Sequence, residues 1–172
     1  MQDEVDELLA AWKREQPDLD VTPLAVLSRV SRLARHLDRA RRIAFAEHDL
    51  EAFEFDVLTA LRRAGPPYEL SPGRLLRQTL VGSGTMTNRL DRLESRGLVR
   101  RRPDPSDGRG VRVRLTARGR TRVDRAVADL VGRERKLLAG IDESDRERLA
   151  ELLREVLLRF EGSEPDRSVD DW

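Results

Sequence analysis

Apolar side chains recur at helical spacing along most of the chain. A first amphipathic helix is expected before Pro17, because four apolar residues follow the i, i+3, i+4, i+7 pattern of a single stripe: Val5, Leu8, Leu9 and Trp12. A second helix is expected from Thr22, which precedes a proline as an N-cap does, to about residue 47. A third begins near Glu51 and ends at the Gly65-Pro66-Pro67 run.

The middle of the chain predicts two short helices followed by a β-hairpin. Ser71-Pro72 repeats the cap-and-proline pattern, and a break at residues 81–83 separates this helix from a second one that ends at Gly97. Two short helices joined by a tight turn form a helix-turn-helix. The β-prone stretches 98–102 and 111–115, separated by the turn-rich loop 103–108, then predict a hairpin with the position of a wing.

Two further helices close the chain. Thr116 is placed to cap a long helix, a last helix is expected from about Ser144 to Phe160, and the polar tail beyond it is expected to fray. The helices at both ends carry more apolar stripe than one small domain can cover, which predicts an obligate homodimer. The fold class is therefore mainly α with a small β wing, a winged helix-turn-helix.

These elements divide the chain into four expected regions. Residues 1–50 form an extra N-terminal helix and a dimerisation helix, and residues 51–115 form the winged helix-turn-helix. Residues 116–161 form the C-terminal dimerisation helices, and residues 162–172 form a flexible tail.

Composition narrows the possible functions. The 172 residues contain no cysteine and only two histidines, which argues against disulfides, thiolate chemistry and a histidine-rich metal site. No pattern matches a nucleophile with its base or a phosphate-binding glycine loop, so an enzyme and a cofactor are not expected. With no long apolar run and an acidic N-terminus, the protein is expected in the cytoplasm, associated with the nucleoid when it is bound to DNA.

The formal net charge of +1 conceals a strong segregation of charge. Residues 71–122 carry 14 basic and 4 acidic side chains, whereas residues 1–70 carry 10 and 14 and residues 123–172 carry 9 and 14. The cationic segment coincides with the predicted helix-turn-helix and hairpin. Double-stranded DNA is therefore the expected partner of this segment.

The second helix of the predicted pair has the composition of a helix that reads the major groove. With Met86, Leu90 and Leu93 turned toward the core, its other side carries short polar groups and one arginine. The expected DNA contacts on this helix are Ser83, Thr85, Thr87, Asn88 and Arg92. An ordinary solvated face is the alternative, and the neighbouring wing and basic segment favour DNA.

The hairpin adds a second expected contact. Arg109 follows a glycine and is placed to project from the tip into a minor groove, with a solvated loop arginine as the alternative. Arg112 and Arg114 alternate with valines, share the outer face of their strand, and are expected to position the DNA backbone rather than read its sequence.

The run from Leu98 to Gly119, LVRRRPDPSDGRGVRVRLTARG, follows LDRLESRG and resembles the signature of the MarR family. The resemblance covers about residues 44–127 and consists of a recognition helix, a D-x-R wing and an L-T-x-x-G motif. It implies a two-fold dimer with interleaved terminal helices, which places two recognition helices about one DNA turn apart over a pseudo-palindrome. Gly108 stands where the family usually has arginine.

A finer resemblance concerns the N-terminal segment, W-K-R-E-Q-P-D-L-D from Trp12 to Asp20, which is similar to the urate-responsive subgroup of the family. It implies a small aromatic anion as effector, urate or a related purine, bound by Trp12, Asp56, Arg89 and Arg101. Periodicity alone favours a packing anchor for Trp12 and an ordinary exposed carboxylate for Asp56, and only the resemblance assigns them to a ligand site. Arg89 lies toward the inward edge of its helix, where it needs a partner such as Asp56.

Three functions follow from these features. The first is a repressor that dissociates from its operator when urate or a related purine binds. The second is a regulator of the same fold that responds to phenolic or lipophilic compounds, with Trp12 purely structural. The third is an architectural DNA-binding protein without an effector, which would bind DNA weakly and without sequence preference.

Overall fold

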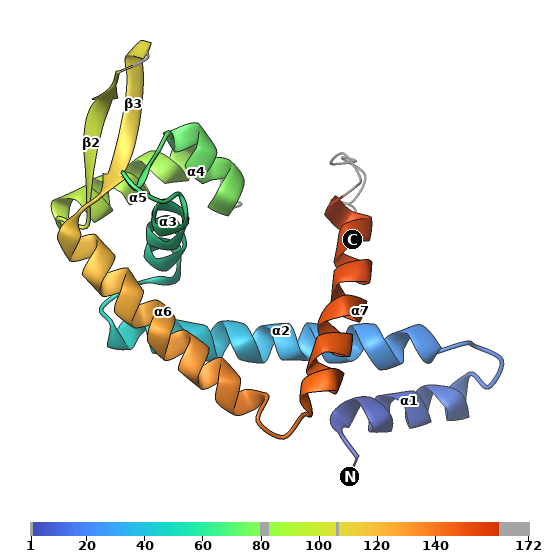
Figure 1. The fold of residues 1–172 in the computed structure, drawn as a ribbon. Helices are drawn as coiled ribbons and strands as arrows, with labels where there is room; N and C mark the ends of the chain where they lie inside the picture. The colour runs from blue at the N-terminus through green and yellow to red at the C-terminus, as the bar shows by residue number, and fades with distance from the viewer. Residues whose placement is uncertain (1, 80–82, 106, 162–172) are drawn as a thin grey trace. The chain divides into compact units, whose positions relative to one another are not determined.

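The computed structural model describes residues 2–79, 83–105 and 107–161, except for the side chains of 83–85, 107–109 and 161. The chain divides into two compact units, of which the first ends at Leu130 and the second begins at Val131. The elements follow one another along the chain as α1 (Glu4–Glu15), α2 (Thr22–Glu47), α3 (Ala52–Arg63), β1 (Glu69–Leu70), α4 (Pro72–Thr79), α5 (Ser83–Ser95), β2 (Val99–Asp104), β3 (Asp107–Leu115), α6 (Ala117–Leu137) and α7 (Glu143–Glu161). Figure 1 shows their course.

Helix α1 lies antiparallel against the first part of α2. Asp3 closes a capping box at the start of α1, and Arg29 of α2 donates to its carboxylate at 2.8 Å and to that of Asp6 at 2.6 Å. The Arg29 guanidinium lowers the pKa of Asp3 to about 2. Val5 is buried, at 1% exposed, so the hairpin of α1 and α2 has an apolar contact beneath its ion pairs.

The start of α2 differs from the predicted cap. The N-cap is Val21, whose side chain makes no capping hydrogen bond, and Thr22 is already helical. The backbone N–H of Thr22 donates to Asp20 Oδ1 at 3.0 Å. Val21 is buried at 4% exposed, which places an apolar side chain where the pattern predicted a polar cap. The proline still lies in the first turn, where its missing N–H costs nothing.

The helix-turn-helix and the hairpin share one core. Strand β3 lies between β1 and β2 in an antiparallel sheet, and α3, α4 and α5 pack with it. Leu58, Leu61, Leu75, Leu93 and Val113 are fully buried in this core. The caps expected here are present: Ser71 Oγ accepts from Arg74 N, Thr116 Oγ1 accepts from Gly119 N at 3.0 Å, and Gly97 has φ +67°.

Two features of the sheet differ from the predictions. Strand β1 was not predicted, because two residues are too short to show a period. The hairpin strands also extend further than expected, with Asp104 opposite Asp107, so four residues of the expected loop 103–108 belong to the strands. The Nε of Arg112 donates to Asp104 Oδ2 at 2.6 Å, which ties the end of β2 to the middle of β3.

Many apolar side chains stay exposed in each unit. In α2 these include Val26, Leu27, Leu33 and Ile43, each more than half exposed. Helix α7 likewise exposes several apolar side chains between Leu149 and Phe160. In the described part of the chain, none of the helices is long and apolar enough to cross a membrane.

Candidate functional site

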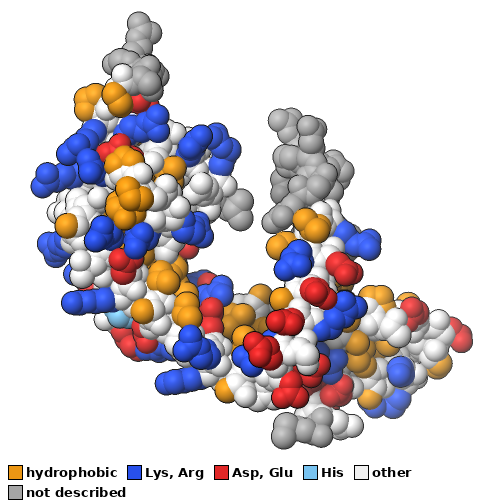
Figure 2. All heavy atoms as spheres, viewed as in Figure 1, with side chains coloured by type: hydrophobic (Ala, Val, Ile, Leu, Met, Phe, Trp, Pro, Cys, Tyr) orange, Lys and Arg blue, Asp and Glu red, His pale blue; other side chains and the backbone are white. Residues whose placement is uncertain are grey.

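Helix α5 has the two faces that its sequence predicted. Met86, Leu90 and Leu93 are buried at 2% exposed or less, whereas Thr87 and Asn88 are exposed. In Figure 2, basic side chains gather over the part of the molecule that contains α4, α5 and the hairpin. The expected contacts Ser83 and Thr85 belong to α5, but their side chains lie outside the described residues, as does that of Arg109 in β3.

Two arginines of α5 contact residues at the start of α3. The Arg89 guanidinium lies 4.8 Å from the centre of the Phe53 ring, and that of Arg92 lies 5.7 Å from the same ring. Arg92 also forms an ion pair with Glu51. Arg92 was expected to face DNA, and it remains half exposed while it contacts α3. The sequence showed that Arg89 needed a partner, and the structure supplies an aromatic ring.

A buried carboxylate fixes the end of α5. Glu54 is fully buried and accepts from the backbone N–H of Glu51 at 2.9 Å and from the Arg96 guanidinium. Arg96 also donates to the side chain of Asp49 at 2.6 Å, and Arg122 of α6 binds the same carboxylate. The two arginines lower the pKa of Asp49, Arg122 having the larger effect. This network joins α3, α5 and α6.

Arg101 lies on β2 and is tied to α5. Its guanidinium pairs with Asp91 and Glu94, the latter at 3.2 Å, and donates to the Thr87 carbonyl at 3.3 Å. Arg101 therefore braces the wing against the recognition helix. The sequence placed Arg101 at an effector site, but in this protomer its acceptors are residues of α5.

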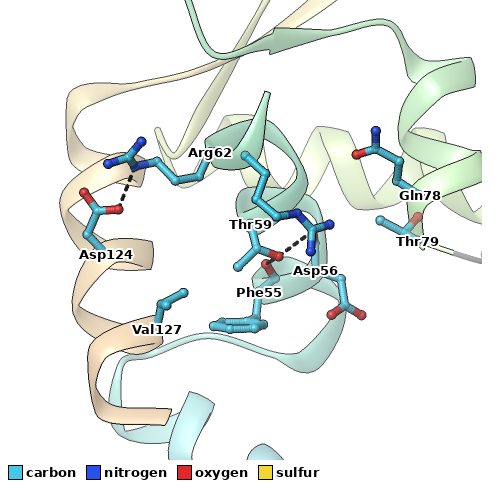
Figure 3. A pocket seen from close by; sticks show the side chains of 9 residues that line it. Phe55, Asp56, Thr59, Arg62, Gln78, Thr79, Asp124 and Val127 are labelled. Atoms are coloured by element: carbon cyan, nitrogen blue, oxygen red, sulfur yellow. Dashed lines mark hydrogen bonds and ion pairs between the residues drawn. The ribbon is translucent and has the colours of Figure 1, made fainter. Parts of the chain in front are cut away.

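A cavity of about 650 Å³ lies between α3, α4 and α6. Phe55 and Val127 form apolar parts of its wall, and Asp56, Thr59 and Arg63 supply polar groups from α3. Figure 3 shows Gln78 and Thr79 on the α4 side and Asp124 on the α6 side, where the Arg62 Nε donates to Asp124 at 2.7 Å. An apolar wall with a few polar groups suits a small polar aromatic ligand.

Asp56 is the predicted site residue that the cavity contains. Although its side chain reaches solvent, burial is the largest effect on its carboxyl and raises its pKa. The charges of Arg89, Arg63 and Arg41 act in the opposite direction. No ion pair within 4.0 Å joins Asp56 to Arg89, both of which lie in the described part of the chain, so their interaction is long-range.

Trp12 does not approach this cavity within one protomer. The pairing of Asp3 with Arg29 places Trp12 level with the start of α2, whereas Asp56 follows Phe55, which stacks on Phe45 near the end of α2. At 1.5 Å per residue, about 30 Å of helix separates the two positions. The structure therefore brings Asp56 and Arg89 into one region and leaves Trp12 and Arg101 elsewhere.

Arg62, Arg63, Thr59 and Gln78 were missed by sequence reasoning. A local signal existed, because Asp56, Thr59 and Arg63 are spaced i, i+3 and i+7 and therefore share one side of α3. The contribution of α4 had no such signal, since Gln78 meets α3 only through the tertiary fold.

A helix-turn-helix whose second helix exposes short polar groups, followed by a three-stranded sheet with a basic hairpin, defines a winged-helix DNA-binding protein. The sequence model for the MarR family matches residues 48–110. The chain is also 39% identical over 153 residues to the HTH-type transcriptional regulator PecS of Dickeya dadantii, covering 89% of this chain and 92% of that protein. The chain belongs to the MarR family of transcriptional regulators.

Solved structures agree with this assignment. A mutant form of MarR from Escherichia coli superposes with a TM-score of 0.64 at 30% identity, covering 77% of this chain and 96% of that one. BpsR of Bordetella bronchiseptica, whose DNA binding is regulated by 6-hydroxynicotinic acid, has a TM-score of 0.59 at 28% identity, covering 74% and 91%. The family and these relatives are DNA-binding regulators rather than enzymes, and the family acts as dimers.

Proposed function

We propose that this protein is a repressor that releases its operator when urate, or a closely related oxidised purine, binds in the cavity beside α3. One observation carries the proposal: the cavity wall contains Asp56, which lies one helical turn from Phe53, the residue that holds Arg89 of the recognition helix. A ligand that acts on Asp56 therefore acts next to the contact that positions α5.

The chemistry of the cavity suits an aromatic anion. Urate is planar and carries one negative charge at neutral pH, and a guanidinium can donate paired hydrogen bonds to its carbonyl edge. Arg63 is exposed and has no ion pair within the described part of the chain, so it is available for this role. The apolar wall formed by Phe55 and Val127 would cover part of the ring.

Protonation of Asp56 would make the binding of an anionic ligand depend on pH. Burial already raises its pKa, and a bound anion raises it further, so binding should draw a proton onto the carboxyl. Ionised Asp56 repels the anion, and protonated Asp56 can donate a hydrogen bond to it. Urate should therefore bind more tightly as the pH falls toward the raised pKa of Asp56, and Asp56→Asn should remove this dependence.

Trp12 lies too far from the cavity to contact a ligand bound there in the same protomer. Any cover that Trp12 gives to the ligand requires the second protomer of the dimer, because α2 holds the two apart within one chain. In a Trp172→Phe background, Trp12 is the remaining tryptophan of the chain. Quenching of its fluorescence by urate would place it at the ligand, and an unchanged signal would leave it a packing residue of α1.

The test is a titration of wild-type protein on an operator duplex selected from random sequences. We expect urate to weaken DNA binding by at least about tenfold and to raise the melting temperature of the free protein. Arg63→Gln should lose the response while retaining DNA binding, and Arg39→Gln on α2 is the control. A response to phenols or hydroxylated aromatic acids but not to urate would overturn the choice of effector. No response to any of them would favour an architectural protein.

A further inference from the structure

The outer face of the wing sheet is crowded with arginine. Val99, Val113 and Leu115 turn inward and are at most 5% exposed, so the residues that alternate with them face solvent. In the antiparallel register, Arg100 stands directly opposite Arg114, and Arg102 stands opposite Arg112. Like charges directly opposite one another destabilise a sheet unless anions compensate them.

Acidic side chains compensate only part of this face. Arg112 pairs with Asp104 at 2.6 Å, and Arg114 pairs with Glu69 at 3.4 Å. These two arginines were expected to contact the DNA backbone, but each already has a carboxylate. Arg100 and Arg102 are exposed and form no ion pair within the described residues.

Helix α6 adds positive charge to the same surface of the wing sheet. Its N-terminus follows β3, and Arg118 in its first turn is exposed and has no ion pair among the described residues. The positive end of a helix normally attracts acidic side chains, and the first turn of α6 contains none. Arg100, Arg102 and Arg118 line one shallow cavity of about 480 Å³ together with Thr116.

We infer that this surface, called here the wing-base patch and made of Arg100, Arg102 and Arg118, binds the phosphate backbone of DNA that flanks the operator. Arg100 and Arg102 lie roughly 6.6 Å apart along β2, since each strand residue advances about 3.3 Å. A row of separate guanidinium groups matches the repeated charges of a polyanion better than one small anion. The patch is distinct from α5 and from the hairpin tip, the elements expected to face the operator itself.

Backbone contacts of this kind add affinity without adding sequence preference. The inference rests on the DNA binding that the family shares, and it does not depend on urate. It predicts that the protein binds a long duplex more tightly than a short one that covers the operator alone. It also predicts that the difference disappears at high salt, since each phosphate contact releases counterions.

The experiment compares Arg100→Gln/Arg102→Gln with wild type on two duplexes, the operator alone and the operator with ten extra base pairs on each side. We expect the variant to bind the long duplex about tenfold more weakly at low salt and to retain wild-type affinity on the short one. The salt slope on the long duplex should fall by roughly one unit for each phosphate that the variant no longer neutralises. Arg118→Gln should have a smaller effect in the same direction.

Lys13→Gln/Arg14→Gln is the matched control, because it removes the same charge from exposed positions of α1. If the control weakened binding to the long duplex as much, the effect would be one of net charge and the inference would be wrong. Equal reductions on both duplexes, or none on either, would also overturn it. Relief of the Arg100 to Arg114 repulsion should leave the melting temperature of the variant unchanged or slightly raised, which excludes misfolding as the cause.

Discussion

The start of α6 packs against Leu98, which lies between α5 and β2, and Gly119 is the residue of α6 at this contact. A Cβ atom added there would lie 2.1 Å from the Leu98 carbonyl oxygen and 2.9 Å from a methyl group of Leu115. The same Leu98 carbonyl accepts from Thr116 N at 3.1 Å, so it cannot move without losing that bond. Only glycine permits α6 to begin this close to β2.

Gly119→Ala should therefore destabilise the protein by about 3 kcal/mol, at the upper end for an overpacked site, because the obstacle is backbone. Gly73→Ala is the control. A Cβ at Gly73 meets nothing within 4 Å, and this helical site should gain roughly 0.5 kcal/mol. Urea unfolding at one fixed protein concentration measures both. A Gly119→Ala protein as stable as wild type would contradict the close approach.

The pairing of α3 with α5 depends on a buried ion pair. Glu54 is fully buried, Arg96 is 23% exposed, and one carboxylate oxygen of Glu54, Oε1, has no hydrogen-bond partner among the described residues. The Arg92 Nε lies 3.9 Å from that oxygen, too far for a hydrogen bond. Because Glu54 also accepts from the Glu51 backbone, it links the start of α3 to the end of α5.

Removal of this carboxylate should be costly. Glu54→Ala leaves Arg96 with the exposed Asp49 as its remaining acidic partner and removes the acceptor of the Glu51 backbone N–H, and we expect a loss on the order of 3 kcal/mol in the free energy of unfolding. Glu54→Gln keeps an acceptor and should lose less. Asp38→Ala, which breaks an exposed i, i+4 pair with Arg42, should cost at most about 0.5 kcal/mol. Equal losses for Glu54→Ala and Asp38→Ala would refute the structural role of the buried pair.

The exposed apolar side chains of α2 and α7 indicate that the protein assembles with a partner. Helix α7 leaves a run of apolar side chains between 39% and 72% exposed, and α2 has several more than half exposed. A single protomer rarely presents apolar surface of this extent to water unless a partner covers it. Members of the family act as dimers, and we expect the second protomer to cover these stripes.

Sedimentation should show a dimer at micromolar concentration, with a melting temperature that rises as the protein concentration increases. Leu153→Glu/Leu157→Glu places two charges on one side of α7 and should yield monomeric or unfolded protein. Leu19→Glu, at an exposed position in the loop between α1 and α2, should remain dimeric. A folded, stable wild-type monomer at micromolar concentration would argue against an obligate dimer.

The sequence by itself determined the elements whose signals are local. Apolar periodicity predicted the helices within a few residues, and the caps at Ser71, Gly97 and Thr116 were recognisable because each acts on backbone groups three or fewer residues away. The buried face of α5 followed from the spacing of Met86, Leu90 and Leu93, and the segregation of charge indicated the DNA-binding segment.

The tertiary structure alone decided which side chains meet. Arg96 and Glu54 are 42 residues apart, and Arg92 and Glu51 are 41 apart, so no local pattern shows that they pair. Arg89 lies against an aromatic ring instead of the expected carboxylate, and Arg112 and Arg114 pair with Asp104 and Glu69. Periodicity reports which face of an element is apolar, whereas partner choice depends on how folding places distant faces against one another.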